Sequence, residues 1–235
     1  MTTPPTPIPA PPPATAAAAP AGFDLGETDR LLTTTRAVRK RLDLGRPVER
    51  EVLLDCLRIA TQAPSGGNTQ PWRWLVVDDP DVRAGLADLY RKGYGPYIAM
   101  QKAAVLAAGG DEDSPILRSS DYLAEHLHEV PVHVIPCLLS RLPEQPTTAD
   151  TAGFYGSILP AVWSFMLALR SRGLGTAYTT LHLQHEREAA ELLGVPETVT
   201  MVALLPVAHV TGDFRPADRK PVENVTYWNS WKQRS

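Results

Sequence analysis

Apolar residues recur at helical spacing between Val48 and Ala63 more clearly than anywhere else in the chain. The apolar positions follow one another at steps of three and four residues, at Val52, Cys56, Ile59 and Ala63. Residues at these steps share one face of a helix, so the segment predicts an amphipathic helix over Val48–Ala63. Pro64 ends it because proline has no amide hydrogen and clashes with the preceding turn. The glycine-containing stretch that follows predicts a loop over 65–71.

The same periodicity predicts six further helices. They cover Thr28–Arg36, Asp81–Tyr90, Ile98–Ala108, Ile116–His128, Phe154–Arg172 and Glu186–Leu193. We expect Gly93-Tyr94-Gly95-Pro96 to separate the second of these from the third, because glycine and proline are the strongest helix breakers. Polar segments at 109–113 and 143–150 predict loops.

Runs of apolar, β-branched and aromatic residues predict four strands. They cover Trp72–Val77, Val132–Leu139, Leu174–Thr180 and Thr198–Val210. Pro136 weakens the second prediction, because proline cannot donate a hydrogen bond to a neighbouring strand. Helices and strands mix without a regular β-α-β repeat, which favours an α+β fold over a doubly wound parallel sheet.

Length and charge limit the class of protein. With 235 residues, the chain can form one domain with a sizeable core, which we place at 26–235. The net charge of -3 provides no basic surplus for nucleic acid, and no uninterrupted apolar stretch indicates a membrane span. Residues 1–25 are rich in proline and alanine and contain no lysine or arginine. They predict a disordered leader rather than a secretory signal.

Cysteine and histidine spacing gives no sign of a metal site. Cys56 and Cys137 do not form a CxxC or other ligand-spaced pattern, so we expect buried free thiols in a reducing, cytoplasmic setting. The histidine pairs lack a third ligand at a recognisable spacing. These pairs are His126 with His128, and His182 with His185.

A basic segment is the first candidate for chemistry. Arg36-Ala37-Val38-Arg39-Lys40-Arg41 places four cations in six residues at the end of a predicted helix. A basic run is usually a solvated face, but the forked donors of arginine also suit a phosphate.

Two glycine-containing segments are the other candidates. In Ala63–Trp72, two glycines let a backbone approach a ligand, and Ser65, Asn68 and Gln70 supply donors and acceptors. The alternative is an ordinary helix-to-strand turn. The second segment, Gly173-Leu174-Gly175-Thr176, continues into Tyr178–Leu181. The glycine-rich fingerprint of a dinucleotide-binding fold follows a strand, whereas this segment precedes one, so it is poor evidence for such a fold.

In their order along the chain, these segments resemble the signature of the nitroreductase superfamily. The most specific part is the block Pro64-Ser65-Gly66-Gly67-Asn68-Thr69-Gln70-Pro71-Trp72, and Arg219-Lys220-Pro221-Val222-Glu223 matches near the end. The resemblance covers about residues 30–231. It implies a nitroreductase-like α+β fold with a central, mostly antiparallel sheet flanked by helices. It also implies an interlocked homodimer with two FMN sites at the subunit interface.

The resemblance assigns roles to residues. Arg36 would face the FMN phosphate and ribityl end, Arg39 the N1–C2=O edge, and Arg219 would be a second phosphate ligand. The loop with Pro64, Ser65, Gly66 and Asn68 would come from the partner chain. The pyrimidine and N5 side would be lined by Thr179, Thr180 and Leu181. The implied cofactor-binding residues are Arg36, Ala37, Arg39, Pro64, Ser65, Gly66, Asn68, Gln70, Tyr178, Thr179, Thr180, Leu181 and Arg219.

The implied reaction is ping-pong transfer of hydride from NADH or NADPH through flavin N5 to a small electron-poor acceptor, a nitroarene or quinone. No catalytic side chain is implied, because the flavin carries the chemistry. Ene reduction, dehalogenation, dehydrogenation and flavin binding without turnover remain alternatives. A plain interaction module that uses its proline-rich leader is a further one.

The chain departs from the family pattern at several positions. Ala37 stands where many members have serine, Ser164 where asparagine or glutamine is frequent, and Ala208 where glycine is usual. The region Tyr90–His128 is longer than in minimal members, and we expect it to act as a lid that sets substrate choice. We expect the polar tail at 211–235, with its isolated aromatics, to pack on the partner subunit.

Overall fold

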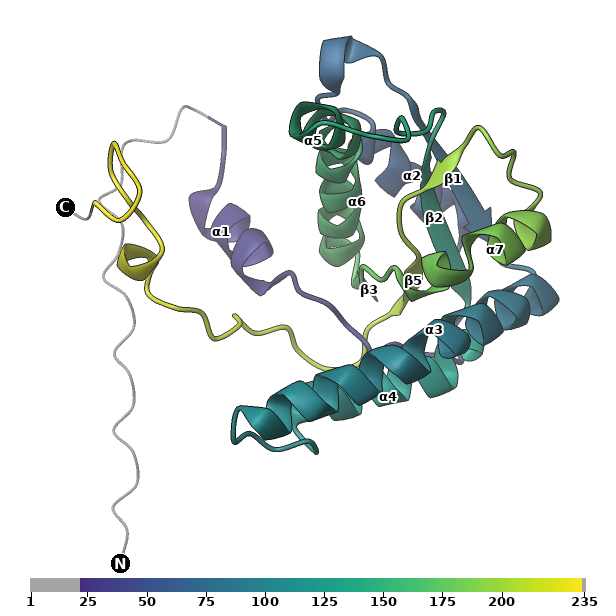
Figure 1. Ribbon diagram of the computed structural model, residues 1–235, viewed down its shortest axis with the longest axis horizontal. Coiled ribbons are helices and arrows are strands. Elements are labelled where there is room, and N and C mark those ends of the chain that lie inside the picture. Colours follow the sequence, from purple (N-terminus) through teal and green to yellow (C-terminus); the bar gives the residue numbers. More distant parts are fainter. Residues whose placement is uncertain (1–21, 234–235) are drawn as a thin grey trace, which may run out of the picture.

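The computed structural model describes residues 22–233, so the predicted leader lies mostly outside the described residues. Figure 1 shows a sheet between two groups of helices, with α1 and the C-terminal segment extending away from this body. The helices are α1 (Leu25–Thr34), α2 (Arg50–Ala60), α3 (Pro80–Ala107), α4 (Pro115–His126), α5 (Thr148–Gly156), α6 (Leu159–Ser171) and α7 (Glu186–Leu193). The strands are β1 (Trp72–Val77), β2 (Val132–Leu138), β3 (Leu174–Thr176), β4 (Thr200–Met201) and β5 (Leu205–His209).

The sheet has the order β1-β2-β5-β3, with β4 also paired to β2. Every strand pair is antiparallel, which confirms the predicted α+β fold. Both faces are covered, so all of β2 is buried. Val132 and Val134 face the core that α2 and α6 share, while Ile135 and Cys137 face the core made with α3, α4 and α7. This alternation follows from the two-residue period of a strand.

Two predicted strands were too long. Leu174–Thr180 contains β3 followed by a single bridge from Thr179 to Leu204. Thr198–Val210 divides into β4 and β5, which both pair with β2 but in registers that differ by one residue. The Val202 amide donates to the Pro136 carbonyl at 2.9 Å, whereas Leu204 exchanges two backbone hydrogen bonds with Thr179.

The predicted helix break at residues 93–96 is wrong, because α3 runs through it for 28 residues. A Cβ on Gly93 would lie 2.4 Å from the Leu181 carbonyl oxygen, so glycine is needed here for close packing. Pro96 removes one helical hydrogen bond, but Tyr90 and Tyr94 are buried on the same helix. Tertiary packing therefore outweighs local helix propensity.

The predicted helix Phe154–Arg172 is two helices, and the predicted loop at 143–150 contains the start of the first. Thr147 and Asp150 form a reciprocal capping box that begins α5. Pro160 lies in the first turn of α6, where its missing amide costs nothing.

The α5–α6 stretch bears on membrane insertion. Among the described residues, Thr148–Ser171 is the stretch long and apolar enough to cross a membrane, with a mean hydropathy of 1.5. The helix is interrupted between α5 and α6, and α6 buries Phe165 and Leu169 in the core. The core helix of a globular protein has the same length and composition.

We predict that Gly93→Ala destabilises the protein, although alanine favours a helix by about 1 kcal/mol over glycine. The added methyl group must displace the Leu181 backbone, and overpacking of this kind costs about 1–3 kcal/mol. Gly95→Ala is the matched control, because its Cβ would meet no atom within 4 Å. Urea unfolding should give a lower free energy for the first variant and an equal or higher one for the second. Equal stabilisation of both would contradict the packing argument.

Candidate functional site

The basic segment lies along the open edge of the sheet. The Val38 amide donates to the Thr176 carbonyl at 2.9 Å, and a bridge joins Leu42 to Val210. A Cβ on Gly175 would lie 2.4 Å from Val210 Cγ2, so the glycine permits this close approach. Val38 is buried as the anchor, while Arg39 is half-buried. Arg36 and Ala37 are exposed beside it.

The C-terminal segment returns to the same place. The Arg36 guanidinium donates to the carbonyls of Arg215 and Pro216 at 3.4 and 3.5 Å. Arg219 follows Pro216 by three residues, which an extended chain spans in about 10 Å. The structure therefore brings Arg36 and Arg219, which are far apart in the sequence, into one neighbourhood.

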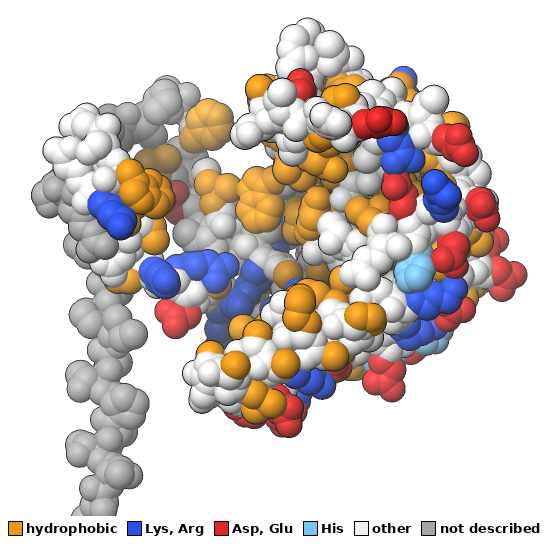
Figure 2. All heavy atoms as spheres, viewed as in Figure 1, with side chains coloured by type: hydrophobic (Ala, Val, Ile, Leu, Met, Phe, Trp, Pro, Cys, Tyr) orange, Lys and Arg blue, Asp and Glu red, His pale blue; other side chains and the backbone are white. Residues whose placement is uncertain are grey.

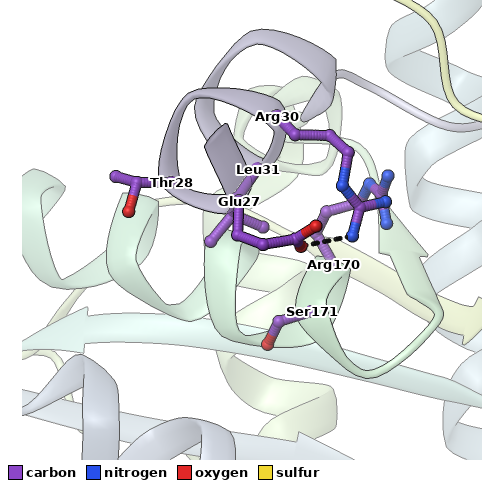
Figure 3. Close-up of a pocket in the computed structure, with 6 residues that line it drawn as sticks. All are labelled: Glu27, Thr28, Arg30, Leu31, Arg170 and Ser171. Carbon is purple, nitrogen blue, oxygen red and sulfur yellow. Dashed lines mark hydrogen bonds and ion pairs between the residues drawn. The ribbon is translucent and has the colours of Figure 1, made fainter. Parts of the chain in front are cut away.

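Two further arginines hold the start of this segment. Arg41 donates to the Asp213 carbonyl, and the Phe214 ring has the Arg170 guanidinium 3.5 Å from its centre. Burial, and then the nearby Arg30 cation, lower the pKa of Arg170. Figure 3 shows the adjacent cavity of about 330 Å³ between α1 and α6. It is lined by Glu27, Thr28, Arg30, Leu31, Arg170 and Ser171, so it contains none of the predicted cofactor residues.

The cations of this neighbourhood have no acidic partners. Elsewhere on the surface, arginines such as Arg58 pair with carboxylates. Within residues 22–233, no carboxylate lies within 4.0 Å of the guanidinium groups of Arg36, Arg39 or Arg219. Figure 2 shows lysine and arginine side chains gathered in the hollow between the body and the extended segments. A group of uncompensated cations favours binding of an anion.

Residues 178–181 follow β3 beside this cluster. The Thr179 amide donates to the Leu204 carbonyl and its carbonyl accepts from the Leu204 amide, at 3.2 and 2.8 Å. Both backbone polar groups of Thr179 are therefore hydrogen-bonded to Leu204, and its side chain is the group that can make other contacts. Tyr178 is 39% exposed and donates to the Val202 carbonyl. Thr180 is exposed, and Leu181 begins the short 3-10 helix η3 (Leu181–His185).

Tyr90 of α3 is buried within electrostatic range of both Thr179 and Arg39. Burial raises the pKa of Tyr90, while a hydrogen bond with the Thr179 side chain and the charge of Arg39 lower it. The structure therefore brings these two predicted residues together. Sequence analysis missed Tyr90, because its position at the end of a predicted helix carried no signal of this contact.

The 64–70 loop is held by its own side chains. The Ser65 hydroxyl accepts from the Gln70 amide at 3.1 Å, and the Gln70 side chain donates to Asn68. Gly67, Asn68 and Gln70 have positive φ angles of 56, 54 and 49°. Non-glycine residues in this left-handed region are uncommon and concentrate at ligand-binding sites. Pro64, Gly66, Asn68 and Gln70 are exposed and Ser65 is half-buried.

Ser157, which sequence analysis missed, fixes the loop to the body. The Gly66 amide donates to the Ser157 hydroxyl at 3.1 Å, and that hydroxyl donates to the Gly153 carbonyl at 2.8 Å. A Cβ on Gly66 would lie 3.0 Å from the same oxygen. The sequence did contain a signal for this contact, because proline is common in the first turn of a helix. Pro160 therefore indicates that a new helix begins there and that Ser157 lies at the junction before it.

Within one chain, the loop is fixed near the start of α6, whereas α1, which leads into the basic segment, contacts the end of α6. Ser157 precedes the first residue of α6, whereas Arg170 near its end donates to the Thr34 hydroxyl at 3.2 Å. The 13 residues of α6 span about 20 Å. The predicted cofactor residues therefore form two groups rather than one.

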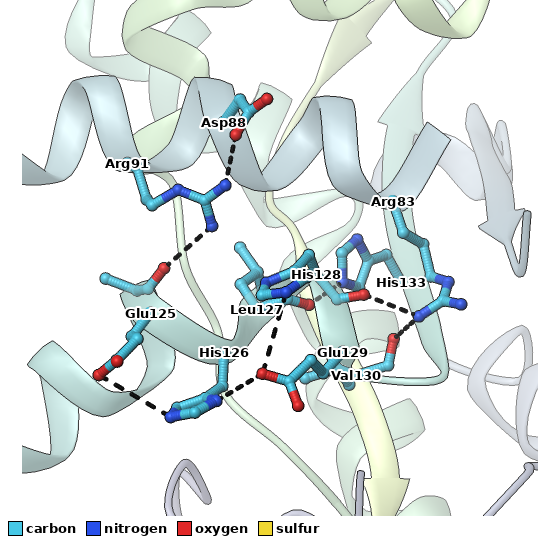
Figure 4. Close-up of polar contacts among 11 residues, drawn as sticks. Arg83, Asp88, Arg91, Glu125, His126, Leu127, His128, Glu129, Val130 and His133 are labelled. Carbon is cyan, nitrogen blue, oxygen red and sulfur yellow. Dashed lines mark hydrogen bonds and ion pairs between the residues drawn. The ribbon is translucent and has the colours of Figure 1, made fainter. Parts of the chain in front are cut away.

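The histidines do not make a metal site in the described part of the chain, where no cluster of three or more potential ligands occurs. His126 pairs with Glu129 at 2.5 Å, within the polar contacts between α3 and the end of α4 in Figure 4. His182 is fully buried, and its ring nitrogens have no hydrogen-bond partner among the described residues. Burial lowers its pKa to about 4, so it is neutral at physiological pH.

Comparisons with known proteins show the family of this chain. A family model described as the nitroreductase family matches residues 32–209. The NADH dehydrogenase of Thermus thermophilus is 25% identical over 206 residues, covering 84% of this chain and 97% of that protein.

Solved structures show the same fold. An iodotyrosine deiodinase bound to FMN and 3-iodo-L-tyrosine has a TM-score of 0.64 at 21% identity, covering 86% of this chain and 98% of that one. The FMN- and NADPH-dependent nitroreductase NfnB from sphigopyxis sp. strain HMH has a TM-score of 0.61 at 22% identity, covering 86% of this chain and 99% of that one. Because the family model spans most of the described domain, the resemblance seen in the sequence is confirmed: this chain belongs to the nitroreductase family.

Proposed function

We propose that this chain is an FMN-dependent oxidoreductase. It takes hydride from NADH or NADPH and passes it to a small electron-poor acceptor, such as a nitroarene or quinone, in two successive half-reactions. The observation that carries this proposal is a group of cations without carboxylate partners among the described residues: Arg36 and Arg39 on the basic segment, and Arg219 on the segment that returns to Arg36. Two solved structures with the same fold are described with FMN, which supports the choice of cofactor.

The chemistry of the residues fits FMN. Arg36 is exposed beside the segment that carries Arg219, as binding of a phosphate dianion requires. Arg39 is half-buried near Thr179, where a cation and a hydroxyl would hold the polar edge of the flavin ring. When bound, FMN supplies the atom that accepts and donates hydride, so the protein needs no nucleophile. The chain's own residues would bind, orient and shield that ring.

We propose that each site is completed by a second copy of the chain. The preorganised 64–70 loop and the cation cluster lie at opposite ends of α6, which supports a site that takes its loop from the partner. Apolar side chains exposed on α2 and α6 support a subunit contact there. They are Leu54, Ile59, Leu159 and Trp163.

The tail at 211–235 fits a role in the same contact. Its described part, residues 211–233, extends from the body in Figure 1 and exposes large apolar side chains. Their exposed fractions run from 58 to 80%, for Val222, Val225, Trp228 and Trp231. Burial of such residues against a partner would stabilise a dimer.

We propose that the α3–α4 hairpin is a lid over the acceptor. It reaches beyond the sheet in Figure 1, and it exposes Met100, Leu106 and Ile116 by 60, 53 and 74%. These flexible, apolar side chains suit contact with a small apolar acceptor.

The absence of a disulfide between the two cysteines of the described chain fits a reducing environment. Cys56 and Cys137 are both buried and free, and burial raises the pKa of each thiol. They are therefore unreactive at neutral pH, and we propose that the protein is cytoplasmic.

Purified protein titrated with FMN should bind the flavin and show its absorbance. Arg39→Ala should raise the dissociation constant about 10- to 100-fold, because hydrogen bonds to charged groups contribute roughly 1.5–3 kcal/mol. Arg187→Ala is the matched control, since Arg187 is exposed on α7 and outside the cluster. Protein that neither carries flavin nor gains it from added FMN would refute the proposed function.

Mixed dimers test whether the site spans two chains. One chain carries Arg39→Ala and the other Asn68→Gly, which keeps a residue suited to the positive φ of 54°. If the loop crosses to the partner, a heterodimer contains one intact site and recovers half the FMN of the unmodified dimer. Recovery no better than that of either variant alone would place both groups of residues in a single-chain site.

Anaerobic mixing with NADH or NADPH tests turnover. We expect the flavin absorbance to bleach and to return with nitroarenes or quinones, and initial-rate plots to give the parallel lines of a ping-pong reaction. A flavin that neither donor bleaches would indicate binding without turnover. Reoxidation by halophenols or enones alone would instead indicate dehalogenation or ene reduction.

A further inference from the structure

Helix α3 has an inner half and an outer half, which meet at Gly95-Pro96. The buried residues of α3 all belong to the inner half, Pro80–Tyr94. The outer half, Tyr97–Ala107, begins with two residues that are partly buried against the core, but Met100 and Leu106 are 60 and 53% exposed. Figure 1 shows the outer half and the start of α4 reaching beyond the sheet. The tertiary contacts that hold the inner half therefore weaken along the outer half.

The backbone of α3 is weakest where the two halves meet. Pro96 has no amide hydrogen, so the Lys92 carbonyl, four residues earlier, loses its helical donor. Gly95 has wide conformational freedom, and a Cβ there would meet no atom within 4 Å. Sharp bends in helices occur at residues of this kind. A change of direction between the two halves would therefore begin at Gly95-Pro96.

The end of α4 and the turn after it are fixed to the inner half of α3. The Arg83 guanidinium donates to the carbonyls of His128 and Val130 at 3.0 and 2.7 Å. The Arg91 guanidinium donates to the Ala124 carbonyl at 3.5 Å. Figure 4 shows both arginines reaching from α3 toward this end of α4. The C-terminal end of α4 is thus held to the body of the protein.

One carboxylate of α4 contacts both halves of α3. The Tyr94 hydroxyl, on the inner half, donates to the Asp121 carboxylate at 2.7 Å. Lys102, on the outer half, pairs with the other oxygen of the same carboxylate at 3.4 Å. Tyr94 and Lys102 are eight residues apart, which is about 12 Å along a helix, and Gly95-Pro96 lies between them. Asp121 therefore links the two halves across the weak point of the helix.

We propose that Gly95-Pro96 is the hinge of the lid and that Asp121 is the latch that keeps the outer half of α3 in line with the inner half. When the latch breaks, the outer half and the start of α4 swing away from the acceptor. The Lys102 and Asp121 side chains are 37 and 43% exposed, so water can replace their ion pair at little cost.

The hinge and latch rest on the proposed function, since that function assigns the α3–α4 hairpin to the acceptor as a lid. A reaction in two half-reactions requires the oxidised donor to leave before the acceptor enters, so the lid must open in each turnover. The hinge is well placed for this. A Cβ on Gly93 would lie 2.4 Å from the Leu181 carbonyl oxygen, so the inner half is packed directly on the candidate site just before the hinge.

Hydrogen exchange of the backbone amides measures how often the lid opens, and it needs no flavin. Tyr94→Phe and Lys102→Met each leave Asp121 attached to one half of α3 alone. Each should raise the exchange rates of residues 97–120 about 3-fold. The double variant should show about the same rise, because both changes break the same latch. Independent contacts would instead multiply to about 9-fold.

Lys92→Met is the matched control, because it removes an exposed ion pair of the inner half, with Glu188 of α7 at 2.9 Å. It should leave the exchange of residues 97–120 unchanged. Pro96→Ala acts in the opposite direction: it supplies the missing amide, so it should slow exchange in the same residues about 3-fold. Unfolding midpoints of all variants report any general loss of stability.

Steady-state kinetics with a nitroarene or quinone link the hinge to turnover. Pro96→Ala should lower kcat, because a stiffer lid opens less often. Lys102→Met should raise the KM of the acceptor, because the lid closes over it less firmly. Unchanged kcat and KM in these two variants would overturn the part of the hinge in turnover.

The exchange data decide the hinge and latch themselves. A multiplied effect in the double variant, an equal rise in Lys92→Met, or wild-type exchange in Pro96→Ala would each overturn them. Failure of the unmodified protein to bind FMN would refute the proposed function instead. Because exchange is measured without flavin, the two failures are distinguishable.

Discussion

The candidate site depends on the contact between the basic segment and the open edge of the sheet at β3. β3 is the last strand in the order β1-β2-β5-β3, so its outer edge needs hydrogen-bond partners. The Val38 amide supplies one to Thr176, and Gly175 leaves room for the Val38 side chain. The same contact that protects the edge presents Arg36 and Arg39 beside residues 178–181. A structural need of the sheet thus determines where the cations lie.

The cost of this arrangement is electrostatic. Arg36, Arg39 and Arg219 share a neighbourhood without carboxylate partners among the described residues, and their mutual repulsion disfavours the compact state. Arg36, Arg41 and Arg170 partly offset this by binding carbonyls or the ring of the 213–216 segment. Proteins keep such destabilising groups of like charges mainly where they serve a function. A phosphate would supply the missing negative charge.

The sequence predicted what depends on local pattern and missed what depends on contacts between distant segments. Trp72–Val77 matched β1 to the residue, because its ends are set by adjacent turn residues. Gly93 was read as a helix breaker, since its reason is a contact with Leu181 that periodicity does not show. The cofactor residues came from the family resemblance, and their division between the two ends of α6 is a property of the fold. Tyr90 and Ser157 emerged only once the elements were packed.

The central claim is that the cation cluster holds the phosphate of FMN. Calorimetric titration of the flavin-free protein with FMN and with riboflavin, which lacks the phosphate, tests it most directly. The account predicts that FMN binds at least about 10-fold more tightly, because charged hydrogen bonds contribute roughly 1.5–3 kcal/mol. It also predicts that this difference shrinks as salt is added, since salt screens exposed charges. Equal affinities for FMN and riboflavin at low salt would contradict it.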